Sequence, residues 1–297
     1  MTKHLIVIAG PTAVGKTRFA IEVAKHFNTE IISCDSRQLY NELNIGVARP
    51  TEQELSEVKH HLIATHSIHD HYDAGSYARD VDAKLAELFE EHDTVIMTGG
   101  TGLYIRAAIQ GLTNLPAQNE QLRQQLSFIL NAEGITALQD IAEGSGVSRE
   151  KVDFDNPQRL MRAIEIAQGE APEEQLGKQT DYDASYYFID RNRNELYDRI
   201  NVRVDEMLKE GFENEARSVY TYKGLNALNT VGYKDFFNYF DGEATREYAI
   251  QKMKQHTRNY AKRQLTWFRN QGHYEQITPD VELFIKILEL KEFRKQS

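Results

Sequence analysis

Apolar residues follow two different periods along the first third of the chain. Leu5–Ala9, Glu30–Cys34 and Thr94–Met97 are short, mainly apolar segments of strand length. Lys16–His26 and Ser76–Glu91, which lie between them, repeat apolar residues at helical spacing. Strands that alternate with helices in this way form parallel sheets. The pattern therefore predicts an α/β fold in which helices flank a parallel sheet.

The pattern changes near Pro116. Asn119–Gly169 has helical periodicity without a strand signal, and Gly169–Asp183 is polar and predicts a loop. Tyr186–Asp190 then returns to a strand pattern, and the rest of the chain is mainly helical. A helical block between strands indicates an insertion into the sheet domain. We therefore expect residues 1–115 to begin a core, residues 116–183 to form an inserted all-helical domain, and residues 184–297 to complete the core with one strand and C-terminal helices.

The composition narrows the class of protein. The chain has 297 residues, of which 40% are hydrophobic and 27% charged, and Cys34 is its one cysteine. No apolar run approaches the roughly 20 residues of a membrane span, and a single cysteine excludes an internal disulfide. We therefore expect a cytoplasmic protein that does not enter the membrane. The sequence leaves the oligomeric state open, and a monomer is our working expectation.

The charge distribution is uneven. The net charge of -10 argues against a nucleic-acid partner, because surfaces that bind nucleic acids are usually basic. Lys252–Arg269, however, contains six Lys or Arg residues and no Asp or Glu. A local basic face on an acidic protein can still supply phosphate contacts.

A glycine-rich motif follows the first predicted strand. It matches the pattern G-x-x-x-x-G-K-[ST] with Gly10, Pro11, Thr12, Ala13, Val14, Gly15, Lys16 and Thr17. In this pattern the glycines let several backbone amides face one anion, the lysine adds a positive charge and the threonine can hold Mg²⁺. The helix that follows offers its positive end to the same anion. The sequence therefore predicts a phosphate-binding loop (P-loop), with Thr17 as a ligand of Mg²⁺.

The loop alone does not identify a reaction, because kinases, NTPases and other enzymes use it. An NTPase usually has an Asp at the end of a second buried strand, where it helps to hold Mg²⁺. Thr94–Met97 continues instead into Thr98-Gly99-Gly100-Thr101. Asp35 closes the second predicted strand, and the carboxyl ends of parallel strands meet at one edge of a sheet. We expect Asp35 beside the phosphates, and a turn or cap residue is the alternative.

Nine sequence blocks occur in an order that resembles one enzyme family. The blocks are GPTAVGKT at Gly10–Thr17, SCDSRQLY at Ser33–Tyr40, GVARP at Gly46–Pro50, HHLI at His60–Ile63, GGTGLYI at Gly99–Ile105, NPQRLMRAIEI at Asn156–Ile166, LYDRINVRVDEML at Leu196–Leu208, VGYKD at Val231–Asp235 and YAKRQLTWFR at Tyr260–Arg269. They resemble the tRNA dimethylallyltransferases, also called tRNA isopentenyltransferases or IPP transferases. These enzymes transfer a dimethylallyl group from dimethylallyl diphosphate to N6 of the adenosine 3′-adjacent to the anticodon in tRNA and release diphosphate. Arg49 stands where Lys is common in the family.

The resemblance implies roles for individual residues. The diphosphate of the donor would bind in the loop Gly10–Thr17, with Mg²⁺ on Thr17. Asp35 would hydrogen-bond the N6 amine and accept its proton, and Thr12 and Arg203 would complete the catalytic set. Residues implied to bind the anticodon stem-loop of tRNA are Asp35, Ser36, Arg37, Gln38, Thr101, Arg123, Gln158, Arg159, Leu160, Met161, Arg162, Lys262, Arg263 and Arg269.

Other functions remain possible on these patterns. A transferase that prenylates free adenine nucleotides would need neither the helical insertion nor the basic C-terminal helix. A P-loop kinase would need the strand-end acid that Thr94–Met97 lacks, and a nucleotide-gated switch that only binds RNA would leave Asp35 without a role. Five histidines between His60 and His71 suggest a metal site, but their spacing favours a structural or surface role.

Overall fold

The computed structural model describes residues 3–112, 116, 119–169 and 178–296, with the side chains of residues 292–296 left aside. It divides into two compact units, one formed by residues 1–110 and 179–297 and the other by residues 111–178. The second unit thus begins and ends five residues earlier than the expected insertion 116–183. The reason is that Tyr182 and Asp183 already pair with the strand Lys3–Ala9 and belong to the sheet. The expected loop Gly169–Asp183 lies mostly outside the described residues.

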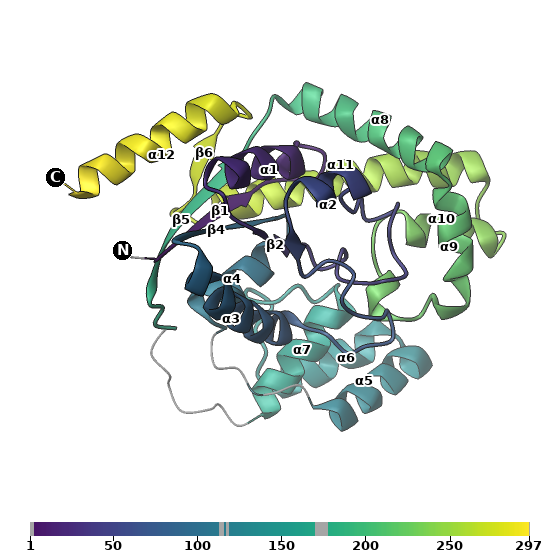
Figure 1. Cartoon of the computed structure of the whole chain (residues 1–297). Coiled ribbons are helices and arrows are strands. Elements are labelled where there is room, and N and C mark those ends of the chain that lie inside the picture. The colour runs from purple at the N-terminus through teal and green to yellow at the C-terminus, as the bar shows by residue number, and fades with distance from the viewer. Residues whose placement is uncertain (1–2, 113–115, 117–118, 170–177, 297) are drawn as a thin grey trace. The chain divides into compact units, whose positions relative to one another are not determined.

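The first unit is built on a parallel sheet of six strands in the order β3-β2-β4-β1-β5-β6 (Figure 1). The expected α/β fold is confirmed. The strands are β1 (Lys3–Ala9), β2 (Ile31–Cys34), β3 (His60–His61), β4 (Thr94–Gly99), β5 (Tyr182–Ile189) and β6 (Glu275–Ile277). One strand was expected after residue 184, and β6 is a further one, which pairs with β5 at the sheet edge.

Successive residues of β1 face opposite sides of the sheet, so two apolar layers cover it. Leu5 and Val7 pack against α3 (Ala74–Glu91) and α4 (Gly102–Gln110), whereas Ile6 and Ile8 pack against α1 (Lys16–His26), α8 (Arg193–Glu210) and α12 (Val281–Gln296). Figure 1 shows α1 and α3 on opposite sides of the strands. Both faces of the central strands are therefore buried, as is usual for a parallel sheet.

A third apolar cluster joins the C-terminal helices to the segment after β2. It includes residues of α8, α9 (Phe212–Ser218), α10 (Tyr233–Phe240) and α11 (Arg246–Arg269) together with Tyr40 and Leu43. The first unit also contains α2 (Glu52–Glu57) and two 3₁₀ turns, Tyr220–Tyr222 and Asn226–Leu228. In α2 a Thr51–Glu54 capping box starts the helix. This cluster fixes the segment that follows β2, which carries the residues expected to form the site.

The second unit consists of α5 (Glu120–Glu133), α6 (Ile135–Gly144) and α7 (Pro157–Gln168). Asn119 and Asn156 cap α5 and α7, because their side chains accept hydrogen bonds from backbone amides of the first turn. The three helices enclose an apolar core of their own, formed by residues such as Leu126, Leu138 and Ile164. Within the described parts of both units, no helix has the length and apolar character of a membrane span.

Candidate active site

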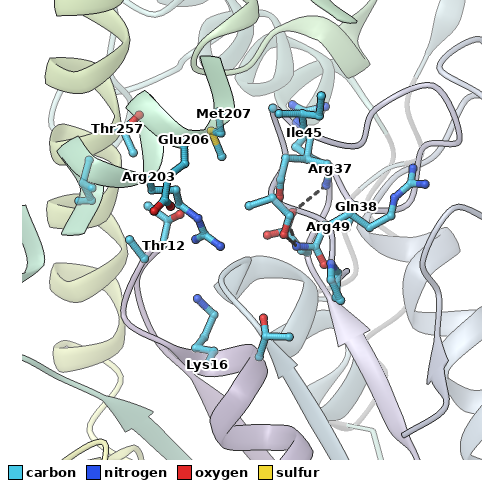
Figure 2. Close-up of a pocket in the computed structure, with 18 of the residues that line it drawn as sticks. Thr12, Lys16, Arg37, Gln38, Ile45, Arg49, Arg203, Glu206, Met207 and Thr257 are labelled. Atoms are coloured by element: carbon cyan, nitrogen blue, oxygen red, sulfur yellow. Dashed lines mark hydrogen bonds between the residues drawn. The ribbon is translucent and has the colours of Figure 1, made fainter. Parts of the chain in front are cut away.

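A cavity of about 1080 Å³ opens where the strands of the sheet end. Its lining comes from the loop after β1, from the residues after β2 and from α8 and α11. Figure 2 shows Lys16 at its base, Thr12 and Arg203 on one side, and Arg37 and Gln38 on the other. The cavity therefore brings together residues that the sequence predicts for the site from distant parts of the chain.

The loop Gly10–Thr17 connects β1 directly to α1. Gly15 precedes the helix with φ of 103°, a conformation that favours glycine. Arg199 Nε donates to Ala13 O and Arg191 Nε to Val14 O, each at 2.8 Å. These two arginines, which the sequence did not single out for this role, hold loop carbonyls from the side of α8.

Lys16 and Arg203 are two of the cations that line the cavity. Lys16 Nζ donates to Pro11 O at 2.7 Å, and burial lowers the pKa of Lys16 to about 8 although the negative charge of Asp35 acts in the opposite direction. Burial also lowers the pKa of Arg203. Within the described chain neither Lys16 nor Arg203 forms an ion pair with a carboxylate. Half-buried positive charges that no carboxylate neutralises favour an anionic ligand, so this part of the cavity is suited to phosphate groups.

Asp35 lines the same cavity at the end of β2. Its Oδ1 accepts a hydrogen bond from Arg37 N at 3.0 Å. Thr101 braces this segment from the turn after β4, because Thr101 N donates to Cys34 O at 3.2 Å and Thr101 Oγ1 accepts from Ser36 N at 3.0 Å. The segment that carries Asp35 is therefore braced at the cavity that the loop Gly10–Thr17 also lines.

Arg37 and Gln38 reach the cavity but also tie neighbouring segments together. Arg37 Nη1 donates to Asn226 O at 3.0 Å, and Gln38 Nε2 donates to Ala48 O at 2.9 Å. Arg49, which stands where Lys is common in the family, donates through Nη2 to Tyr40 O at 2.7 Å. These bonds give the expected tRNA-contacting segment a defined shape.

The basic stretch Lys252–Arg269 lies entirely within α11. Lys262 and Arg263 are exposed, as expected for residues that contact phosphates. Arg269 is engaged with the buried carboxylate of Asp190 at 2.5 Å. Part of the basic stretch therefore has a structural partner, and Lys262 and Arg263 are the more accessible cations.

In the helical unit, the predicted contact residues divide into two groups. Gln158 and Arg159 are exposed on α7. Leu160 is 0% and Met161 2% exposed, and both belong to the core of the unit. The expectation that these two side chains contact tRNA is corrected, because side chains buried in a core hold the helices together instead.

Arg123 and Arg162, the other two residues of this unit that were expected to contact tRNA, both pair with Glu165. The side chain of Glu165 is fully buried and binds Arg123 Nε at 2.7 Å and Arg162 Nη1 at 3.1 Å. Arg162 also donates to Pro116 O at 2.7 Å. Because removal of one partner of a buried ion pair leaves a charge uncompensated, this cluster also has a structural role.

The histidine-rich segment makes local contacts. His60 Nδ1 lies 2.8 Å from Val58 O, and His61 Nε2 lies 2.5 Å from Glu30 Oε2. The ring of His66 lies against Tyr72. Among the described residues, no three His, Cys, Asp or Glu side chains form a group that could hold a metal ion.

Two residues near the site carry contacts that the sequence analysis missed. Gln264 is a buried polar residue of α11, and Glu215 of α9 accepts hydrogen bonds from the loop that contains Gly46. The burial of Gln264 was predictable, because it shares a helix face with the apolar residues Ala261 and Phe268. No local pattern marks Glu215, whose backbone-amide partners lie about 170 positions earlier in the sequence.

The fold and the site together define an α/β protein whose first strand-to-helix loop lines one cavity with Asp35, Lys16 and Arg203. A family model described as IPP transferase matches residues 38–271. The chain is 45% identical to a tRNA dimethylallyltransferase of Christiangramia forsetii over 275 residues, with 91% of each protein covered. It is 40% identical to tRNA dimethylallyltransferase 2 of Parabacteroides distasonis over 282 residues, or 93% of this chain and 94% of the relative.

Similarity extends to a solved structure. The crystal structure of a tRNA isopentenylpyrophosphate transferase from Bacillus halodurans matches with a TM-score of 0.71 at 34% identity, covering 99% of this chain and 96% of that one. The chain therefore belongs to the IPP transferase family, as its nine sequence blocks predict.

Proposed function

We propose that this protein transfers a dimethylallyl group from dimethylallyl diphosphate to N6 of the adenosine 3′-adjacent to the anticodon in tRNA and releases diphosphate. The observation that carries the proposal is that Lys16, Arg203 and Asp35 line one cavity, with the Asp35 carboxylate close enough to act on both positive charges. Two cations suit a diphosphate, and a carboxylate suits an amine that must lose a proton. The protein would act in the cytoplasm as a monomer.

The negative charge of the leaving group explains why cations line this part of the cavity. As the bond between the allylic carbon and the diphosphate oxygen breaks, negative charge grows on the departing oxygens. Lys16, Arg203 and the amides of the loop are already in place, so they stabilise this charge with little rearrangement. Thr12, which lines the cavity, would contact the same group.

Asp35 is the proposed proton acceptor. The N6 amine of adenine is a weak nucleophile, and a carboxylate that orients it and accepts its proton contributes roughly 10²–10⁴-fold in rate. The new carbon–nitrogen bond forms while the carbon–oxygen bond to diphosphate breaks, and the amine proton passes to Asp35. An anticodon loop is single-stranded, so its bases can leave the stack at modest cost.

The residues present fit Mg²⁺ as a partner of the diphosphate. Thr17 lines the cavity in the first turn of α1, next to Lys16, and its hydroxyl is an oxygen donor of the kind Mg²⁺ prefers. Because the described residues form no cluster of three acidic or other metal-binding side chains, the remaining ligands would be water and diphosphate oxygens. When bound, Mg²⁺ would neutralise charge on the leaving group.

We choose tRNA as the acceptor on the basis of the relatives, whose names state that they act on tRNA. In the helical unit, Gln158 and Arg159 offer exposed polar groups. In the sheet unit, Lys262 and Arg263 offer exposed cations on α11. A free nucleotide would need neither group of residues, and this favours tRNA over a mononucleotide.

A transfer assay tests the proposal. The protein is incubated with Mg²⁺, labelled dimethylallyl diphosphate and either unmodified tRNA or AMP, with and without ATP. We expect label in tRNA, none of it dependent on ATP, and little or none in AMP. Absence of label in tRNA, a requirement for ATP, or a preference for AMP would show the assignment to be wrong.

A further inference from the structure

Gln264 lies in the basic stretch of α11 but does not share its exposure. The side chain is 6% exposed, whereas its neighbours Lys262 and Arg263 are exposed. A buried amide needs partners for both its oxygen and its nitrogen. The partners of Gln264 therefore indicate what this residue does.

Both ends of the amide bind backbone, and each end binds a different segment. Gln264 Oε1 accepts a hydrogen bond from Thr12 N at 2.9 Å. Gln264 Nε2 donates to Gly100 O, also at 2.9 Å. Thr12 N can only donate and Gly100 O can only accept, so one orientation of the amide satisfies both contacts.

The amide sits just beyond the last pair of a strand ladder. β1 and β4 run side by side, with Ala9 opposite Gly99 at the end of their pairing. The two chains then separate, one into the phosphate loop and the other into the turn that leads to α4. The side-chain amide of Gln264 occupies this gap as a peptide group would, with its acceptor toward one chain and its donor toward the other.

The two segments serve different parts of the proposed site. Thr12 lies in the loop on the diphosphate side. Gly100 immediately precedes Thr101, which binds Cys34 O and Ser36 N and so holds the segment that contains Asp35. Gln264 therefore connects the loop for the leaving group to the turn that holds the proton acceptor.

The fit around Gln264 is tight. A Cβ added to Gly100 would lie 2.3 Å from Gln264 Nε2, closer than nonbonded atoms approach. A side chain at position 100 would displace the amide. Gly100 is thus required by a close approach of protein groups.

We propose that Gln264 is a positioning residue that sets the spacing between the phosphate loop and Asp35. The inference rests on the proposed function, because the spacing matters only if an amine held by Asp35 attacks a carbon held by the loop. Transfer requires the reacting atoms at about 3–3.5 Å, and a misplacement of about 1 Å can cost roughly 100-fold in rate. Gln264 lines the cavity, but both ends of its amide bind protein backbone, so it acts through the two segments that it connects.

Gln264→Glu is the informative variant because it nearly preserves shape. An ionised glutamate still accepts from Thr12 N but cannot donate to Gly100 O, and the two oxygens repel. We expect kcat for tRNA prenylation to fall roughly 100-fold, while the Kd values for Mg²⁺-diphosphate and for tRNA stay within about threefold. Gln251→Glu places the same charge at an exposed position of α11 and serves as the control, with an unchanged kcat.

A pH profile separates positioning from general damage. A protonated glutamate again donates to Gly100 O, so the ratio of the variant kcat to the native kcat should rise as the pH falls. Lys16, Asp35 and Arg203 line the same cavity in both proteins, so the ratio compares the two enzymes with the same set of neighbouring charges. A variant that had simply lost its fold would not recover at lower pH.

Gly100→Ala provides an independent test, since residue 264 remains glutamine while the added methyl group displaces its amide. We expect a similar fall in kcat, and faster hydrogen exchange at the amides of residues 10–17 and 99–102 in both variants. An unchanged kcat and unchanged exchange in both variants, with the native protein active, would overturn the positioning role alone. If the native protein itself fails to prenylate tRNA, the proposed function fails, and the exchange data still decide whether Gln264 connects the two segments.

Discussion

Glu215 connects one wall of the cavity to the helices behind it, and its removal tests this arrangement. Its carboxylate accepts hydrogen bonds from the backbone amides of Asn44 at 3.0 Å, Ile45 at 2.8 Å and Gly46 at 2.8 Å, and from the Tyr233 hydroxyl at 2.6 Å. Two of the family blocks, GVARP and VGYKD, meet at this carboxylate. Glu215→Ala would leave all four donors without their acceptor.

The expected loss of stability follows from the exposure of these donors. A hydrogen bond to a charged group contributes about 1.5–3 kcal/mol when its donor stays buried and unpaired after the mutation. Asn44 is exposed, and Ile45 and Gly46 are half-buried, so their amides regain water in part. We therefore expect Glu215→Ala to lower the free energy of unfolding by roughly 2–4 kcal/mol, well below the sum of four buried bonds.

Urea unfolding monitored by circular dichroism measures this loss. The matched control is Glu213→Ala in the same helix, whose carboxylate pairs with Arg246 at 2.7 Å and Arg217 at 3.7 Å. Surface ion pairs contribute about 0–1 kcal/mol, so the control should change little. Limited proteolysis should also cut within residues 41–50 faster in Glu215→Ala. A loss below about 1 kcal/mol, or an equal loss in both variants, would refute the reasoning.

Three further predictions concern the proposed reaction. Asp35→Asn retains an acceptor for Arg37 N but removes the base, so kcat should fall about 10²–10⁴-fold with diphosphate affinity nearly unchanged, and an unaltered kcat would exclude Asp35 as the base. Because burial lowers the pKa of Lys16 to about 8, this positive charge is present below pH 8 and lost above it. Diphosphate affinity measured by calorimetry should therefore decline by up to about tenfold per pH unit above 8, and a constant affinity would contradict a role for the Lys16 charge. Affinity for tRNA should fall at least about tenfold between roughly 50 and 200 mM salt despite the net charge of -10, and a flat response would argue against a local basic face.

The long periodic elements could be predicted from the sequence, and the short ones could not. Lys16–His26 is a helix with the predicted bounds, because its apolar face and the preceding Gly15 define both its packing and its start. The two-residue strand β3 and the three-residue strand β6 are too short to show a period. Helix α2 has six residues, and the Thr51–Glu54 capping box was its one local signal.

The same distinction applies to the site. The loop Gly10–Thr17 and Asp35 were predictable, because a motif and the edge of a parallel sheet specify their positions. The contacts of Gln264, Arg191 and Glu215 were not, because they join residues that are distant in the sequence. Leu160 and Met161 were expected to contact tRNA but are buried in the core of the helical unit. Their place in a family sequence block does not indicate which side chains of a helix face the core.

The position of β1 in the sheet has a consequence for synthesis of the chain on the ribosome. β1 lies between β4 and β5, and β5 emerges roughly 170 residues after β1. At a translation rate of about 5–20 residues per second, one edge of this apolar strand remains unpaired for roughly 9–35 s. The helical unit is made within this interval and has its own core, so it can fold in the meantime. An unpaired apolar strand edge is prone to aggregation, and the nascent chain therefore passes its most vulnerable stage before Tyr182 is translated.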